Sequence, residues 1–264
     1  ADEKARKGKL RTYGVIEHDK KREVNLLKLR ETLLNGTFHT SKYDVFTIYE
    51  PKEREIYRLP YFPDRILHHA IMNVLEPIWV STFTADTYSC IKNRGIHAAA
   101  KKVKQALRED PEGTTFCLKL DIRKFYPSIN HDVLKSILRR KLKDKRLLRL
   151  LDEIIDSADG VPIGNYLSQY FANLYLTYFD HWIKEQKRVK HYFRYADDIV
   201  ILASDKSYLH SLMGEIRAYL GDLKLEVKGN WQVFPVAARG IDFVGYVFFH
   251  THTRMRKGIK KTFC

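Results

Sequence analysis

Two adjacent carboxylates between strand-like runs constrain this chain more than any other feature. Asp197 and Asp198 lie between residues 191–195 and 199–202, which are rich in aromatic and β-branched side chains. Such runs predict β-strands, and the short step between them predicts a hairpin turn. Two like charges at a turn raise the free energy of the fold unless a cation neutralises them. Their oxygen atoms suit a hard divalent metal, although a solvated turn is the alternative for this pair taken alone.

A third carboxylate, Asp121, ends the strand-like run 116–122. Carboxylates from two separate strands can hold two metal ions roughly 3.5–4 Å apart, where one ion activates a primer hydroxyl and both stabilise charge on the α-phosphate. We therefore predict that Asp121, Asp197 and Asp198 are catalytic residues and metal ligands. Taken alone, Asp121 would normally be interpreted as a strand-end carboxylate that caps the following helix.

A turn and a helix start lie between these carboxylates. Pro162 and Gly164 interrupt the chain before a helix predicted to begin near Tyr166. Gly164 would allow the backbone to approach a flat ligand, and Ser168 and Gln169 could form hydrogen bonds from the first helical turns. When this segment is considered alone, ordinary core packing is the favoured explanation.

In their order and in their residues, these motifs resemble those of reverse transcriptases, and the resemblance covers nearly the whole chain. The box Tyr195-Ala196-Asp197-Asp198 carries the likeness, and 242–246 resembles the strands of a primer grip. The chain resembles most closely the reverse transcriptases of diversity-generating retroelements, in segments 49–54, 64–70, 75–78, 231–233, 239–241 and above all Ile163-Gly164…Ser168-Gln169. Most reverse transcriptases carry Gln-Gly and end this motif in Ser-Pro.

The resemblance implies an α+β right-hand polymerase with fingers and palm, in which an antiparallel palm sheet packs on helices and the thumb is missing or truncated. The expected division is a basic lead-in and fingers in 1–115, a palm in 116–249 with fingers contributing up to about 165, and a basic thumb start or tail in 250–264. Local patterns add a helix from Asp64 that ends before Pro77, and a helix 131–141 capped by Asn130.

The resemblance also assigns roles to further residues. Nucleotide-binding residues would be Lys52, Arg54, Arg58, Tyr126, Ile163, Gly164 and Gln169. Template or primer contacts would come from Arg65, Arg94, Tyr195, Gly245 and Tyr246. The backbone carbonyl of Ile122 would assist the metal, and Lys228 or Lys224 would be a candidate general acid.

Three of these assignments have structural alternatives. Tyr126 would exclude the ribose 2′-hydroxyl by steric contact, or else be a core aromatic beside Phe125. Lys52 would clamp a triphosphate, or else belong to a solvated basic turn. Arg65 would contact the template backbone, or else pair with Asp64 at the helix end.

Composition agrees with a nucleic-acid binder. The net charge is +15 and the pI is about 9.6, but ribosomal and membrane-surface proteins share this property. There is no apolar stretch of transmembrane length and no secretory signal. The cysteines lack metal-ligand spacing, and Cys90 and Cys117 are predicted to be buried thiols, which fits a reducing cytoplasm. The resemblance implies that the protein is bacterial or phage-encoded.

The expected activity is RNA-directed DNA synthesis that produces mutagenic cDNA, with two Mg²⁺ ions that Mn²⁺ could replace. The partners would be template RNA, a cDNA primer strand, deoxynucleoside triphosphates and a small basic accessory protein oligomer, without a membrane. Ile163 lacks the polar group of a Gln, which would loosen base discrimination. The alternatives are a reverse transcriptase of another bacterial class (group II intron-like, retron or phage defence) or a non-catalytic nucleic-acid-binding palm.

Overall fold

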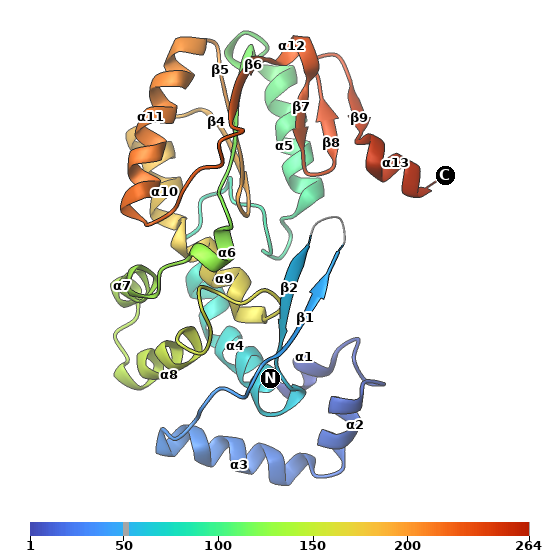
Figure 1. Ribbon diagram of the computed structural model, residues 1–264, viewed down its shortest axis with the longest axis vertical. Coiled ribbons are helices and arrows are strands. Elements are labelled where there is room, and N and C mark those ends of the chain that lie inside the picture. Colours follow the sequence, from blue (N-terminus) through green and yellow to red (C-terminus); the bar gives the residue numbers. More distant parts are fainter. Residues whose placement is uncertain (50–52, 264) are drawn as a thin grey trace. The chain divides into compact units, whose positions relative to one another are not determined.

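A computed structural model describes residues 1–49 and 53–263 of the chain (Figure 1). The chain forms two compact units, each built from two segments. Unit 1 comprises Ala1–Thr82 and Ile129–Tyr175, and unit 2 comprises Phe83–Ser128 and Leu176–Cys264. Each unit combines helices with antiparallel strands, which confirms the α+β class. The predicted division into 1–115, 116–249 and 250–264 is a division by function and stays a prediction.

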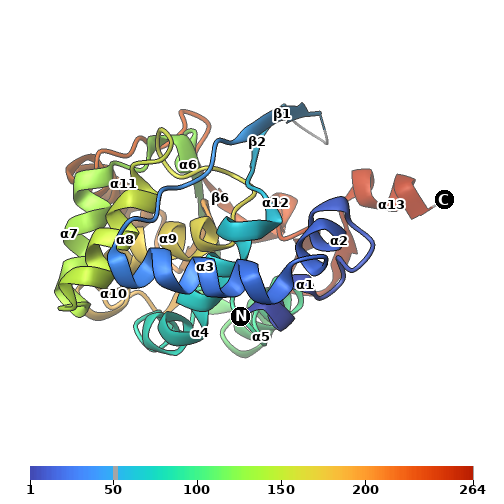
Figure 2. The same ribbon diagram turned by 90° about the horizontal axis from the view of Figure 1, so that it is seen from below.

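Unit 1 consists mainly of helices, with one β-hairpin that projects from them (Figures 1 and 2). Its elements are α1 (Asp2–Arg6), α2 (Tyr13–Asp19), α3 (Arg22–Asn35), β1 (Asp44–Ile48), β2 (Arg54–Arg58), α4 (Ile66–Val80), α7 (His131–Lys141), α8 (Lys145–Ile155) and α9 (Tyr166–Tyr175). The Asn130 side chain accepts a hydrogen bond from the Val133 backbone N–H at 3.1 Å. This bond confirms the predicted cap, because it satisfies a donor that the helix leaves unpaired.

Helix α4 does not end before Pro77, so the sequence-based boundary is wrong. The helix continues to Val80 with Pro77 inside it. Trp79 is almost fully buried, and its ring packs against the rings of Tyr170 and Phe171. Burying such a side chain offsets the hydrogen bond that a proline removes from a helix.

Unit 2 contains two antiparallel sheets and their helices. Its elements are α5 (Ile96–Glu109), β3 (Phe116–Asp121), α6 (Phe125–Ser128), α10 (Thr177–His181), β4 (His191–Tyr195), β5 (Asp198–Ala203), α11 (Lys206–Asp222), β6 (Gln232–Pro235), α12 (Val236–Arg239), β7 (Ile241–Phe243), β8 (Tyr246–Phe248), β9 (Thr253–Met255) and α13 (Lys257–Phe263). The larger sheet has the order β4-β5-β3-β6, and the smaller has the order β7-β8-β9.

Both faces of the larger sheet are covered, as strand alternation requires when both are apolar. One face contributes Cys117, Phe193 and Val200 to a buried cluster with α5 and the β7–β8 hairpin. Helix α11 contacts β3, β5 and β6 and lies on the opposite side of the sheet from α5 (Figure 1). Cys117 is buried as predicted, whereas Cys90 is exposed, because it lies in a turn outside the sheet.

Candidate active site

The three predicted carboxylates meet at one end of the larger sheet of unit 2. Asp121 ends β3 and is paired across the ladder with Asp198, the first residue of β5. Asp197 lies in the turn between β4 and β5, which confirms the predicted hairpin. Its backbone carbonyl accepts a hydrogen bond from the Ile122 N–H at 3.4 Å. Strand pairing therefore brings together carboxylates that are far apart in the sequence.

The electrostatics of this cluster favour a cation. Burial raises the pKa of Asp197, and the neighbouring Asp121 carboxyl raises it further by charge repulsion and by hydrogen bonding. Burial also raises the pKa of Asp198 to about 6, an effect that Lys119 opposes and Asp121 strengthens. In a partly desolvated site, each ionised carboxylate makes ionisation of its neighbour less favourable. Positive charge placed there would restore full ionisation of the group.

Two lysines contact the carboxylates. The Lys228 Nζ donates to Asp121 Oδ2 at 2.6 Å, and the Lys228 backbone N–H donates to the Asp121 carbonyl at 2.9 Å. The Lys119 Nζ lies 3.5 Å from Asp198 Oδ1 and also donates to the backbone carbonyl of Asp242. Lys228 therefore lies beside the carboxylates, as a general acid would. Lys224 is exposed just after α11, and among the described residues it has no contact with them.

Sequence reasoning missed Lys119, although a signal for it was present. Lys119 precedes Asp121 by two residues in β3. Side chains two residues apart in a strand lie on the same face, so its proximity to the site followed from the strand prediction.

The donor set fits a hard divalent cation. Asp121 Oδ1 and Asp198 Oδ1 are buried oxygen atoms for which the described part of the chain supplies no hydrogen-bond partner. Buried acceptors are normally satisfied, and carboxylate oxygens are the ligands that such cations prefer. In the described ranges, however, no group of three or more His, Cys, Asp or Glu side chains already has the arrangement of a metal centre. Ile122 is buried and pairs with Val227, and the role of its carbonyl as a ligand stays a prediction.

Tyr126 lies in the same unit, on the short helix α6. Its ring contacts Phe125 edge-on, with centroids 5.6 Å apart, and Phe125 is the buried member of the pair. Burial raises the pKa of Tyr126, as do the neighbouring Cys90 and Asp197. Tyr126 is thus a half-buried aromatic beside the carboxylates, which is compatible with contact to the sugar of a nucleotide.

We predict that Tyr126→Ala lets ribonucleotides enter more readily, because a gate that acts by steric exclusion is lost with its ring. The measurement is single-nucleotide extension with dATP and with ATP. Phe125→Leu, a change in the buried neighbour, is the control for altered packing. An unchanged ratio of the two rates in Tyr126→Ala would identify this residue as a core aromatic.

Gly164 has a structural explanation inside unit 1. Its φ is +118°, and an added Cβ would lie 2.8 Å from the Tyr57 carbonyl oxygen. The neighbouring Ile163 carbonyl accepts a hydrogen bond from the Tyr57 N–H at 2.8 Å. The close approach that requires glycine is therefore to strand β2, and the flat ligand that we expected is not needed to explain it. Ile163 is half-buried, and Gln169 is exposed on α9; their nucleotide-binding roles stay predictions.

The predicted basic residues of the β1–β2 hairpin belong to unit 1, as Gly164 does. Arg54 and Arg58 are exposed on β2; Arg58 pairs with Asp44 and its guanidinium lies 5.6 Å from the ring centroid of Phe46. These residues are accessible to an anionic ligand. Lys52, the third predicted triphosphate contact, lies outside the described residues.

Arg65 and Arg94, the predicted template contacts, both hold backbone segments. The Arg65 Nε donates to the Ala5 carbonyl at 3.1 Å, and Arg65 lines a groove of about 600 Å³ within unit 1 that also includes Tyr13, Tyr57 and Gly164. The Asp64 carboxylate accepts instead from the Ser41 N–H at 3.0 Å. The Arg94 Nη1 donates to the Thr84 and Thr87 carbonyls. Their template roles stay predictions.

The remaining predicted contacts lie on unit 2. Tyr195 is paired with Asp198 across the hairpin, so it directly precedes the turn that carries Asp197. Gly245 has a φ of +90° in the tight turn between β7 and β8, and Tyr246 begins β8. Their contacts with template or primer stay predictions.

A buried ion pair supports the turn before Asp197. The Arg194 Nε and Nη2 donate to the two Asp180 carboxylate oxygens at 2.7 and 2.6 Å, and both side chains are completely buried. The Arg194 Nη1 donates to the Ala196 carbonyl at 3.0 Å. Ala196 has a φ of +54°, which is unusual for a residue with a Cβ. Arg194 thus holds the turn that carries Asp197, a role that the sequence reasoning did not identify.

Carboxylate clusters that can hold two metal ions occur in polymerases, nucleases and phosphatases. Residues 50–248 match the family described as reverse transcriptase (RNA-dependent DNA polymerase), and the chain therefore belongs to this family. The predicted enzyme class, an RNA-directed DNA polymerase, is confirmed at this level.

The chain is also similar to two curated proteins in sequence and to a solved structure in fold. Protein YkfC of Escherichia coli is 26% identical, over 88% of this chain and 73% of that protein. The group II intron-encoded protein LtrA of Lactococcus lactis is 23% identical, over 67% of this chain but 31% of its own length. A Candida tropicalis telomerase truncated from its C-terminal domain superposes with a TM-score of 0.64, at 12% identity, over 83% of this chain and 55% of that one. The predicted polymerase fold is confirmed.

Proposed function

We propose that this chain extends a DNA primer on an RNA template by two-metal nucleotidyl transfer at Asp121, Asp197 and Asp198. The observation that carries the proposal is the pairing of Asp121 with Asp198 beside Asp197, with one buried oxygen of each paired carboxylate that accepts no hydrogen bond from the described residues. Two Mg²⁺ ions, replaceable by Mn²⁺, would activate the primer 3′-hydroxyl and stabilise charge on the α-phosphate. Family membership supports the proposal.

The chain's own residues have distinct tasks in this reaction. Lys228, which donates to Asp121, is the candidate to protonate the leaving pyrophosphate, because an ammonium there can transfer a proton as the bond to the leaving group breaks. Arg54 and Arg58 hold the triphosphate, since guanidinium groups bind phosphate oxygens in a bidentate manner. Tyr126 excludes the ribose 2′-hydroxyl.

Primer extension on an RNA template with a DNA primer, deoxynucleotides and Mg²⁺ tests the proposal. We expect cDNA that depends on the template sequence and disappears on chelation. Binding of the template–primer without any extension would instead support the alternative of a non-catalytic palm.

Within the family, we propose the diversity-generating class, whose members copy a structured template RNA with errors at adenine and work with a small basic accessory protein in the cytoplasm. The motif Ile163-Gly164…Ser168-Gln169 supports this class. The similarity to group II intron-encoded LtrA favours the alternative of an intron-type enzyme. Paired template and variable repeats beside the gene would support the first, and flanking intron RNA domains the second. In the described part of the chain, no helix is both long enough and apolar enough to span a membrane.

We predict that Ile163→Gln lowers misincorporation opposite template adenine more than opposite other bases. A restored hydrogen bond contributes about 0.5–1.5 kcal/mol, so the change should be roughly two- to tenfold. Sequencing cDNA made by both forms on one template measures it. Ile163→Leu, which keeps an apolar side chain, is the matched control. A spectrum that changes equally at all four bases would remove Ile163 as the source of the bias.

A further inference from the structure

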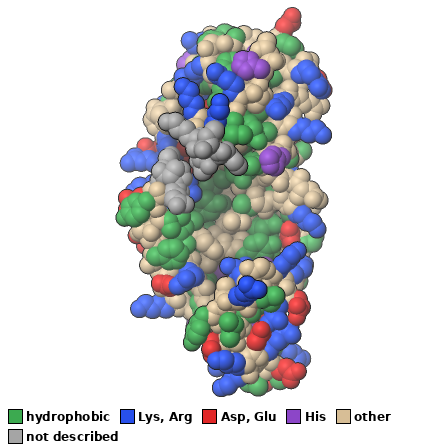
Figure 3. All heavy atoms as spheres, turned by 90° about the vertical axis from the view of Figure 1, so that its right-hand side faces the viewer, with side chains coloured by type: hydrophobic (Ala, Val, Ile, Leu, Met, Phe, Trp, Pro, Cys, Tyr) green, Lys and Arg blue, Asp and Glu red, His purple; other side chains and the backbone are tan. Residues whose placement is uncertain are grey.

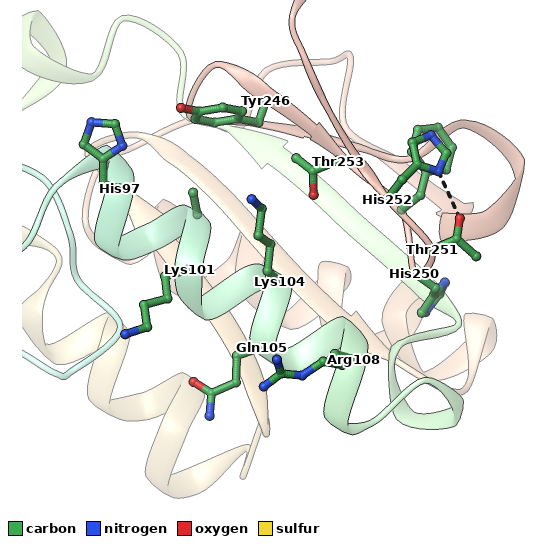
Figure 4. Close-up of a pocket in the computed structure, with 12 residues that line it drawn as sticks. His97, Lys101, Lys104, Gln105, Arg108, Tyr246, His250, Thr251, His252 and Thr253 are labelled. Atoms are coloured by element: carbon green, nitrogen blue, oxygen red, sulfur yellow. Dashed lines mark hydrogen bonds between the residues drawn. The ribbon is translucent and has the colours of Figure 1, made fainter.

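A basic groove runs along the outer face of α5 in unit 2 (Figure 4). Its volume is about 780 Å³, and its lining comes from α5 and from residues 246–253. Lys101, Lys104 and Arg108 recur at helical spacing and are exposed, which places them on one face of the helix. Arg108 lies 3.2 Å from Glu109. Among the described residues, Lys101 and Lys104 have no acidic partner.

The opposite wall of the groove offers flat rings and hydroxyl groups. The His252 ring stacks on Phe249 with centroids 4.6 Å apart and planes 10° from parallel, and the Arg254 guanidinium lies 4.8 Å from the same ring centroid. Thr251 and Thr253 also line the groove. Figure 3 shows Lys and Arg side chains in both the upper and the lower part of this face, and His side chains mainly in the upper part. Cationic side chains that face aromatic rings are typical of single-stranded nucleic-acid sites.

The groove leads away from the catalytic carboxylates. His250 Nε2 lies 3.0 Å from the Thr114 hydroxyl, just before β3 begins at Phe116. Asp121 is at the other end of that strand. A strand rises about 3.3 Å per residue, so this end of the groove is separated from Asp121 by roughly the length of β3, about 17 Å. A ligand there would be held apart from the reacting atoms.

We propose that this groove binds single-stranded RNA outside the stretch that is paired with DNA. Lys101 and Lys104 would contact successive phosphates, bases would stack on the Phe249–His252 platform, and the threonine hydroxyls would contact ribose 2′-hydroxyls, which only RNA carries. An acidic peptide would satisfy the lysines and leave the ring platform without a partner. The choice of RNA rests on the proposed function, whereas binding in the groove is measured without catalysis.

The test is the double change Lys101→Gln/Lys104→Gln in the full chain. A labelled oligo(U) in a fluorescence anisotropy titration should bind about 25-fold more weakly at 0.1 M salt, and the salt slope should fall by about 1.4, as loss of two single-strand phosphate contacts requires. The matched control is Lys141→Gln/Lys145→Gln on α7 and α8, which removes the same charge from other exposed lysines. Its affinity should change less than threefold.

Four results would overturn the proposal: equal losses in both double variants, oligo(dT) binding as tightly as oligo(U), polyglutamate competing as well as oligo(U), or an equal loss for a preformed RNA–DNA hybrid. Single-nucleotide extension on a short RNA–DNA hybrid distinguishes failure of the groove proposal from failure of the proposed polymerase activity. The double variant should extend it at the wild-type rate, and an enzyme inactive on that hybrid can still confirm the groove by binding.

Discussion

Replacing Asp197 by Asn should abolish nucleotide addition while the protein stays folded. Asn keeps the shape of the side chain and removes the charge that opposes Asp121 in the same site. The fold should therefore be unchanged or slightly more stable, because a repulsive pair is lost. Extension should fall by 10²-fold or more, the magnitude typical of a lost electrostatic contact in a transition state. Single-turnover extension and a thermal unfolding curve measure the two effects.

The matched control for this prediction is Asp132→Asn, an exposed carboxylate in the first turn of α7. It should leave extension within about twofold, since surface substitutions rarely change stability by more than about 0.5 kcal/mol. Retention of more than roughly a tenth of wild-type extension by Asp197→Asn would contradict the assignment of this carboxylate to the metal site.

Local rules predicted those parts of the fold that depend on local sequence. The Asn130 cap followed from one side chain and the donors of the next turn. The hairpin around Asp197 followed from an aromatic run, a β-branched run and a short polar step between them. The meeting of Asp121 with Asp198 is a long-range pairing, and it was inferred from the requirement of metal chemistry for two strands and from resemblance to a family.

Properties that depend on a distant neighbour were not predictable. Gly164 is required by the Tyr57 carbonyl, which no pattern around residue 164 reveals. Helix α4 passes Pro77 because Trp79 is buried against α9, and tertiary packing of this kind overrides a local propensity. The Arg194–Asp180 pair joins β4 to α10, and a basic residue within a strand gives no sign of its partner.

That buried pair leads to the second prediction. Arg194→Met should destabilise the protein by about 3–5 kcal/mol, because Asp180 would be left as an unpaired buried charge. The same change removes the donor to the Ala196 carbonyl, so the turn before Asp197 would lose its support and extension would fall more than stability alone explains. Chemical denaturation and extension at a temperature where the variant is folded measure both. Arg149→Met, an exposed arginine on α8, is the control and should be nearly neutral.

The double variant Arg194→Met/Asp180→Leu separates the two roles of Arg194. Replacing both charges by apolar side chains removes the unpaired carboxylate, so part of the stability should return. The recovery is incomplete because the buried Tyr192 and Thr87 hydroxyls, which donate to Asp180, lose their acceptor. The Ala196 carbonyl still lacks its donor, and Ala196 must keep a left-handed backbone conformation that costs roughly 1–2 kcal/mol. Extension should therefore remain low in a protein that is more stable than the Arg194→Met single variant. If extension recovered together with stability, Arg194 would stabilise the core without positioning the turn, and the geometry of Asp197 would depend on strand pairing alone.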